Sequence, residues 1–268
     1  MPGVNTVTAD IAGQGTDATE ARAGAVPSIP DLVTAWGQGW VVSRGAPAPV
    51  VVPGGFRVDV GLPGHRSRHV LHSYDAGSLS RLARTLVQPG SWIKISGDRA
   101  TLRAAFPAAW RMDIPGWLMA RPLVAEASMR AATTEVAGTS MPAGMTEVAG
   151  ATMRAGVIDP PYRLRVDLDG RVIVAMVLDR DGALAASGRL APAGAYGIVD
   201  QVETAVAHRR RGLGSVVMRA LAERAAEDGV RTGVLVATDD GRALYERLGW
   251  TVRSEVSGAY LPEPDRVS

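Results

Sequence analysis

The chain contains no cysteine, one lysine (Lys94) and two phenylalanines. Without cysteine there is no disulfide framework, no thiolate metal site and no cysteine nucleophile, which excludes a mechanism through an acyl-cysteine. The sequence also lacks a run of 18 or more apolar residues, and its first 25 residues have neither a basic start nor an apolar stretch. We therefore expect no membrane span and no secretory signal, and a cytoplasmic location.

Net charge is also small, because 29 basic residues face 27 acidic ones, for a formal charge of +2. The bases are almost all arginine and form no long stripe, so we do not expect nucleic acid as a partner. What the sequence does have is apolar residues, 46% of 268, which is enough to bury a substantial core.

The composition changes along the chain and predicts four segments. Residues 1–30 are rich in Gly, Ala, Thr and Pro without a hydrophobic period, which predicts a disordered arm. Residues 31–123 hold five of the six tryptophans and predict a small α+β domain. Residues 124–160 contain a short repeat rich in small residues and predict a linker. Residues 161–262 form the predicted C-terminal domain.

Two groups of side chains in the tryptophan-rich segment admit a functional interpretation. The tryptophans could line an aromatic pocket, but we favour core packing, because aromatic side chains commonly supply buried area. The histidines could ligate a metal, but a strand turns alternate residues to opposite faces, so we expect no metal site. The residues concerned are Trp36, Trp40, Trp92, Trp110 and Trp117, and His65, His69 and His72.

Hydrophobic periodicity predicts short elements in the same segment. The expected strands are Phe56–Val60, His69–Tyr74 and Trp92–Ile95, and the expected helices are Ser78–Val87 and Arg99–Phe106, the second capped near Asp98.

The C-terminal segment begins with an antiparallel meander, predicted from alternating apolar residues and Asp-Gly turns. A helix, a strand, a helix and a strand follow, so the fold class is α/β (α+β), with a mixed, mostly antiparallel sheet and crossover helices. The meander strands are Tyr162–Asp167, Val172–Leu178, Ala183–Leu190 and Tyr196–Thr204. The later elements are helix Leu213–Glu227, strand Thr232–Thr238, helix Arg242–Leu248 capped by Asp239 and Asp240, and strand Trp250–Val256.

The stretch Val202–Gly214 joins a strand to a helix through a glycine-rich basic turn, and a helix start of this kind favours a phosphate. A P-loop is excluded because Ser215 follows Gly214 with no lysine between them. A Rossmann fingerprint is excluded because Val217 stands where glycine or alanine is required, and because the turn closes a meander rather than opening the domain.

The turn fits a third pattern, since Arg209, Gly212 and Gly214 reproduce the [QR]xxGx[GA] pyrophosphate motif. The downstream run Gly241–Trp250 looks like the A-x-x-L-Y-x-x-x-G-[FW] ending of the same family. Over about residues 162–256 the sequence resembles the Gcn5-related N-acetyltransferase (GNAT) superfamily. The resemblance implies acetyl-CoA as co-substrate, no metal, and direct attack of an amine on the thioester.

The chemistry of the turn agrees with a diphosphate ligand, because glycine allows close approach and backbone N–H groups can donate to its oxygens. The resemblance adds main-chain groups of the two flanking strands as contacts for the pantetheine arm. The predicted coenzyme-binding residues are Val202, Thr204, Val206, Arg209, Arg210, Arg211, Gly212, Leu213, Gly214, Ser215 and Thr238.

The resemblance assigns Tyr245 as the general acid beside the sulfur. Asp200 and Glu203 are candidates for the base, but their odd spacing places them on opposite faces unless a bulge intervenes, and we favour Glu203. His208 or a water relay could serve instead. The family's usual asparagine is absent, and Asp239 or Asp240 stands near its place.

The expected function is acetyl transfer to a primary amine of a small molecule. A protein or peptide N-acetyltransferase is the alternative, and a non-catalytic acyl-CoA-binding protein is the alternative from another class. A homodimer is compatible with the sequence. The two helices that line the acceptor pocket in the family are not evident in this sequence. Residues 31–123, the repeat segment or a degenerate second copy of the fold in the N-terminal part could line the pocket instead.

Overall fold

The computed structural model describes residues 26–124 and 162–264. Most of the predicted arm (1–30) and all but the first residue of the predicted linker (124–160) therefore lie outside the described residues. The strands are β1 (Val50–Val52), β2 (Gly55–Val58), β3 (Ser67–Leu71), β4 (Ser91–Ser96), β5 (Arg111–Met112), β6 (Gly116–Pro122), β7 (Arg163–Asp169), β8 (Val172–Leu178), β9 (Leu184–Ala193), β10 (Tyr196–Thr204), β11 (Thr232–Ala237) and β12 (Thr251–Tyr260). The helices are α2 (Ile29–Arg44), α3 (Ala76–Thr85), α4 (Arg99–Ala105), α6 (Leu213–Glu227) and α7 (Asp239–Arg247), with a 3₁₀ turn η1 (Val206–His208).

The strands form one mixed sheet in the order β1-β2-β3-β4-β12-β6-β11-β10-β9-β8-β7, with β5 paired to β12 beside this path. In the described part of the chain, only β3 with β4 and β10 with β11 pair in parallel. The predicted mixed, mostly antiparallel sheet with crossover helices is thus confirmed. The hairpins β7–β8 and β8–β9 turn at the predicted Asp-Gly pairs, where Gly170 and Gly182 have φ values of 59° and 83°.

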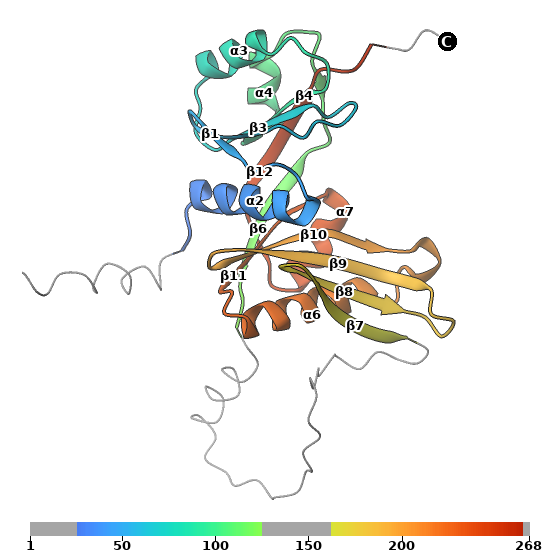
Figure 1. Ribbon diagram of the computed structural model, residues 1–268. Helices are drawn as coiled ribbons and strands as arrows, with labels where there is room; N and C mark the ends of the chain where they lie inside the picture. Colours follow the sequence, from blue (N-terminus) through green and yellow to red (C-terminus); the bar gives the residue numbers. More distant parts are fainter. Residues whose placement is uncertain (1–25, 125–161, 265–268) are drawn as a thin grey trace, which may run out of the picture.

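The same succession of elements occurs twice. A strand, a crossover helix, a parallel strand, a helix and a strand follow one another in β3-α3-β4-α4-β6 and again in β10-α6-β11-α7-β12, with the two-residue β5 between α4 and β6. The last strands are exchanged, because β12 lies between β4 and β6, and β6 pairs with β11. The sheet therefore continues across the predicted boundary between residues 31–123 and 161–262 (Figure 1). The division into two domains remains a proposal, and so does the idea that the N-terminal half is a degenerate second copy of the fold.

Helix α2 is absent from the sequence-based prediction, which placed residues up to 30 in the arm and assigned no helix after them. Its start carries a capping box, in which the Ser28 hydroxyl accepts from the Asp31 N–H at 3.3 Å and the Asp31 carboxylate accepts from Ser28. Pro30 lies in the first turn, and Gly45 ends the helix with φ 60°. These local signals are present in the sequence, but no helix was predicted from them.

The helices cover both faces of the central strands (Figure 1). Helix α2 packs on one face, where Leu32, Trp36 and Trp40 share a buried cluster with Ile198 of β10. Helix α6 packs on the opposite face, and a third cluster lies under α3 and α4. Helix α2, contributed by the N-terminal half, thus covers this face of β9, β10 and β11.

Core packing accounts for most of the tryptophans, since Trp36, Trp40 and Trp110 are buried while Trp92 and Trp117 are partly buried.

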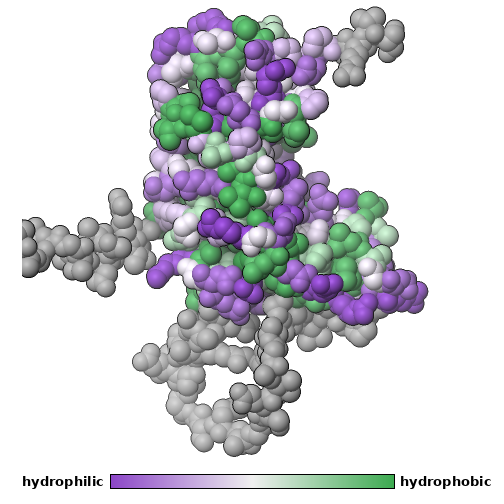
Figure 2. All heavy atoms as spheres, viewed as in Figure 1, coloured by the Kyte–Doolittle hydropathy of each residue, from purple (hydrophilic) through white to green (hydrophobic). Residues whose placement is uncertain are grey.

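In residues 26–124 and 162–264, no three His, Cys, Asp or Glu side chains are grouped to hold a metal. Within the same ranges, no helix is long and apolar enough to cross a membrane. Figure 2 shows hydrophilic residues interspersed with small groups of hydrophobic ones on the visible face.

Candidate functional site

Strands β10 and β11 begin as neighbours and then separate. They pair only from Tyr196 with Thr232 to Ile198 with Val234, although β10 continues to Thr204 and β11 to Ala237. Beyond this point β10 pairs with β9 and β11 pairs with β6 on their outer sides. The facing edges of the two strands thus present main-chain groups that are unpaired across the gap within the described chain, as the family resemblance implied.

A bulge in β10 decides where the two candidate bases lie. The register with β9 shifts between Asp200 and Glu203, and Gln201 has a φ of 53°. Asp200 accepts two hydrogen bonds from Arg44 of α2, at 2.6 and 2.9 Å, and Glu203 also acts electrostatically on Arg44. Both carboxylates therefore act on the α2 side of the sheet, whereas a regular strand would have placed them on opposite faces. Val202, between them, packs into the core on the α6 side.

The glycine turn is built as an open helix start. Gly212 is the N-cap of α6 with φ 76°, it has no side chain to cap the helix, and a Cβ placed on it would meet nothing within 4 Å. Ser215 donates its N–H to Gly212 at 3.0 Å, so it is used within the turn. The N–H groups of Leu213 and Gly214 have no intrahelical partner, and they are the ones that can receive an anion.

The three turn arginines have different surroundings. Arg209 donates to the Thr204 carbonyl at 3.3 Å, which ties the turn to the end of β10. Arg211 donates to the Tyr162 hydroxyl at 3.1 Å. Arg210 is exposed in a left-handed conformation with φ 65°. Arg209 and Arg211 therefore hold the shape of the turn, and Arg210 has the most freedom to reach an outer phosphate.

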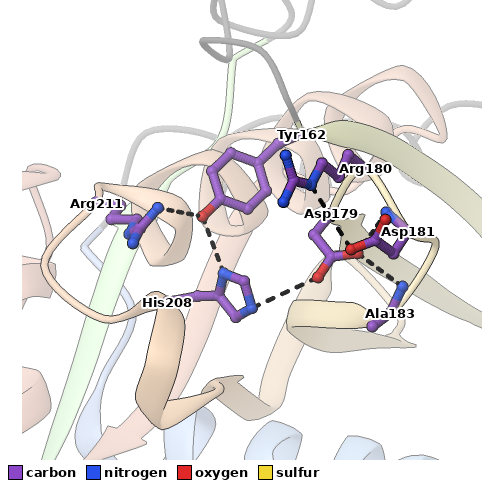
Figure 3. A network of polar contacts seen from close by, with 7 residues as sticks. All are labelled: Tyr162, Asp179, Arg180, Asp181, Ala183, His208 and Arg211. Atoms are coloured by element: carbon purple, nitrogen blue, oxygen red, sulfur yellow. Dashed lines mark hydrogen bonds and ion pairs between the residues drawn. The ribbon is translucent and has the colours of Figure 1, made fainter.

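His208 belongs to a polar network at the back of this turn (Figure 3). Its Nδ1 lies 2.9 Å from the Tyr162 hydroxyl, and its Nε2 lies 3.7 Å from Asp179 Oδ2 in the loop between β8 and β9. These contacts connect the turn to the start of the C-terminal half. The Tyr162 contact occupies Nδ1, whereas the 3.7 Å separation between Nε2 and Asp179 is longer than a hydrogen bond.

The end of β10, the start of α6 and helix α7 meet at one point. A Cβ on Gly214 would lie 3.2 Å from Leu244 of α7 and 3.8 Å from the Thr204 hydroxyl. Tyr245 follows Leu244 and is largely buried against Trp250, with ring centroids 6.3 Å apart. The structure thus brings the glycine turn, the separated strands and the tyrosine helix together, although Asp200 of β10 and Tyr245 of α7 are 45 residues apart in sequence.

Burial raises the pKa of Tyr245 to about 12, and the nearby negative charge of Asp200 acts in the same direction. The phenol therefore stays protonated at neutral pH. Within the described residues its hydroxyl makes no hydrogen bond. It is thus a donor available to a neighbouring sulfur, better suited to hydrogen-bond a developing thiolate than to lose its proton completely.

The start of α7 differs from the prediction. The helix begins at Asp239 and its N-cap is Thr238, whose hydroxyl accepts from Gly241 at 3.3 Å, so Asp239 and Asp240 lie in the first turn and are not caps. Asp239 instead accepts from the Trp117 indole of β6 at 2.6 Å, and Arg242 stacks over the same indole at 4.3 Å. Asp239 therefore anchors α7 to the sheet. Thr238 lies beside the gap, but its hydroxyl is used in capping.

The equivalent turn of the N-terminal half cannot serve as a second site. Helix α3 is capped by Asp75, which accepts from the Ser78 N–H at 2.9 Å, so a carboxylate already occupies its start. Strands β3 and β4 also pair along the whole length of β3 and do not separate. The open helix start and the gap occur together only at α6 in the described chain.

Sequence reasoning missed Arg44 as a part of this site. It lies 156 residues from Asp200 in sequence and reaches it only because α2 packs across β10. No local pattern around Arg44 could reveal this pairing. Val206, predicted to contact the coenzyme, lies in η1 with 77% of its surface exposed, and its side chain adds nothing to the core.

Comparisons with known proteins concern the fold. Residues 176–257 match the family model described as FR47-like protein. A GCN5-related N-acetyltransferase from Kribbella flavida superposes with a TM-score of 0.53 at 16% identity, covering 90% of this chain and 98% of that one. A protein described as an acetyltransferase from the GNAT family of Novosphingobium aromaticivorans gives a TM-score of 0.49 at 17% identity, covering 88% and 99%.

A search of curated proteins found no significant match. The GNAT resemblance inferred from Arg209, Gly212, Gly214 and Tyr245 is nevertheless confirmed at the level of the fold. Residues 176–257 are similar to the FR47-like family, and the chain has the fold of a GCN5-related N-acetyltransferase.

Proposed function

We propose that this protein is an acetyl-CoA-dependent N-acetyltransferase that acts on a primary amine of a small molecule. The observation that carries the proposal is the meeting of the open start of α6, the gap between β10 and β11, and the unpartnered Tyr245 hydroxyl. The fold supports an N-acyltransferase, and the acetyl group and the small acceptor are the finer parts of the proposal.

Binding would use the start of α6 for the diphosphate. The N–H groups of Leu213 and Gly214 and the helix dipole attract its negative charge, and Arg210 adds a mobile cation. The pantetheine arm would follow the gap. There the main-chain groups of β10 and β11 that do not pair with each other are free to bond to the arm. This arrangement directs the thioester toward Tyr245.

The reaction would need one proton removed and one supplied. The amine nitrogen bonds to the thioester carbonyl carbon, the carbon–sulfur bond breaks, the amine loses a proton and the sulfur gains one. Tyr245 would donate a hydrogen bond to the leaving sulfur. Glu203 is the better base, because it is exposed and makes no hydrogen bond within the described chain, while Arg44 compensates the charge of Asp200.

Thiol release from acetyl-CoA in the presence of a panel of amines tests the proposal. We expect amine-dependent release that falls about 100-fold in Tyr245→Phe, a typical loss for a general acid. Tyr196→Phe, at the paired end of β10, is the matched control and should keep the wild-type rate. Saturable coenzyme binding without thiol release for any amine or peptide would instead indicate a non-catalytic acyl-CoA-binding protein, and release with peptides alone would indicate a protein acetyltransferase.

A further inference from the structure

Three cations gather where α2 meets β3 and β4. Arg68 of β3 stacks on Trp40 of α2, with its guanidinium carbon 4.6 Å from the ring centre, and it lies 5.9 Å from the ring of Trp92. Arg44 lies 5.9 Å from the same Trp40 ring. Lys94, the only lysine of the chain, lies on the adjacent strand β4 in register with Val70, and Arg68 acts on it electrostatically. Two guanidinium groups therefore share one indole at the junction of the two halves.

The carboxylates near these cations are bonded to the other two. Asp200 accepts both hydrogen bonds of Arg44, and Asp113 accepts from Lys94 at 2.8 Å. Both also act on Arg68 electrostatically, and Glu203 acts on Arg44, but within residues 26–124 and 162–264 no carboxylate accepts a hydrogen bond from Arg68. Its Nε donates to His65 Nε2 at 3.1 Å. Burial lowers the pKa of His65 to about 4, so this imidazole is neutral at pH 7 and supplies no charge of its own.

The environment of Arg68 favours an anion. Burial, together with the nearby Arg44, lowers the pKa of Arg68 to about 10, so the group is poorly solvated yet still charged at neutral pH. A largely buried guanidinium without a hydrogen-bonded carboxylate costs free energy, part of which a bound anion would recover. The terminal nitrogens of Arg68 make no hydrogen bond within the described residues, where its Nε donates to His65. They can therefore donate in parallel to a carboxylate or phosphate.

This cluster is connected to the reaction centre through Asp200. The Asp200 carboxylate binds Arg44 beside Trp40, and its charge acts on both Tyr245 and Arg68. It therefore links the proposed acid electrostatically to Arg68. An acceptor that used both places would have its amine beside Glu203 and Tyr245 and its far end near Trp40.

We propose that Arg68, stacked on Trp40 and next to Arg44, binds an anionic group of the acceptor, a carboxylate or a phosphate carried on the same small molecule as the amine. This inference rests on the proposed acetyltransferase function and names the class of its substrate. It assigns a specificity role to the N-terminal half, which contributes all three of these side chains.

The test compares acceptors that differ only in charge. Wild-type protein is assayed for thiol release with ω-amino acids of increasing length against their carboxamides, and with phosphoethanolamine against ethanolamine. In one of the two series, we expect kcat/KM to be at least about tenfold higher for the anionic acceptor than for its neutral partner. The series with the larger ratio shows whether the site prefers a carboxylate or a phosphate. Arg68→Gln should abolish this preference, with a loss of about 10-fold to 100-fold for the anionic acceptor and little change for the neutral one.

Arg68→Lys should keep part of the preference, because it retains the charge but not the two-pronged donor. Arg66→Gln, an exposed arginine two residues earlier, should keep all of it. No preference in the wild-type protein, or an unchanged preference in a folded Arg68→Gln, would overturn the proposal. Calorimetric binding of the same pairs without acetyl-CoA tests the anion site even if no thiol is released, so its failure is distinct from failure of the acetyltransferase proposal.

Discussion

Replacing Gly212 with alanine tests whether the start of α6 holds the coenzyme. The residue has φ 76°, which is costly for any residue with a Cβ, but the added methyl meets no protein atom within 4 Å. Gly45, at the end of α2, has φ 60° and the same open surroundings. The two substitutions should therefore lower the free energy of unfolding equally, by about 1 kcal/mol, or about 2 to 4 °C in Tm.

Binding should separate the two variants. In Gly212→Ala the methyl group stands at the mouth of the turn and keeps phosphate oxygens from the N–H groups of Leu213 and Gly214. Loss of two hydrogen bonds to a charged group, at about 1.5 kcal/mol each, predicts a Kd for coenzyme A that is about 100-fold weaker. Gly45→Ala should bind as the wild type does.

Isothermal titration calorimetry with coenzyme A measures this difference, and thermal unfolding monitored by circular dichroism provides the stability comparison. The expected stoichiometry is one coenzyme per chain, because Asp75 occupies the corresponding helix start of the N-terminal half. Wild-type affinity in a Gly212→Ala protein that is destabilised as much as Gly45→Ala would refute the placement of the diphosphate at α6.

Three further predictions concern catalysis and stability. Tyr245→Phe should change the free energy of unfolding by less than about 1 kcal/mol in urea titrations, because the hydroxyl has no hydrogen bond in the described chain. A larger loss would show that the hydroxyl has a structural partner. Arg44→Gln leaves the largely buried Asp200 without its partner and should lower the free energy of unfolding by about 1 to 3 kcal/mol in the same assay. Arg165→Gln removes a partner from an exposed pair and should lower it by less than about 0.5 kcal/mol. Equal losses in the two variants would contradict this reasoning. Burial, with Arg57 nearby, lowers the pKa of His69 to about 4, so the unfolded chain binds a proton first, between pH 6.5 and 4. The contribution of His69 to stability should be full above pH 6.5 and fall by about 2 kcal/mol as the pH decreases to 4, allowing for partial solvent screening. Burial also lowers the pKa of His65 to about 4, so His69→Leu should reduce the decline without removing it, and an unchanged decline in the variant would contradict the assignment to His69.

Local patterns predicted the C-terminal half well. The strands from β7 to β10 follow alternating apolar residues and Asp-Gly turns, and α6 spans the predicted Leu213–Glu227. These elements depend on short-range periodicity and on glycine in left-handed conformations, which neighbouring residues encode. The elements missed were α2, β1, β5 and β6. Strands β1 and β5 are only three and two residues long, too short for a periodic signal.

Other features were outside the reach of local reasoning. Strand β6 reads as an isolated apolar run, and nothing in it indicates that it pairs with β11 and β12 more than 100 residues later. The bulge at Gln201 was considered but could not be placed, because a positive φ at a glutamine depends on the surrounding sheet. That bulge brings Glu203 to the same side as Asp200.

The sequence alone determined the proposed coenzyme side, since the arginine-glycine turn and Tyr245 each belong to a contiguous stretch with recognisable spacing. Tertiary structure decided the proposed acceptor side. Arg44 and Arg68 meet at Trp40 because α2 crosses the sheet and because β6 and β12 exchange places between the halves. Contacts over such sequence separations arise from packing of whole elements, and no local pattern encodes them.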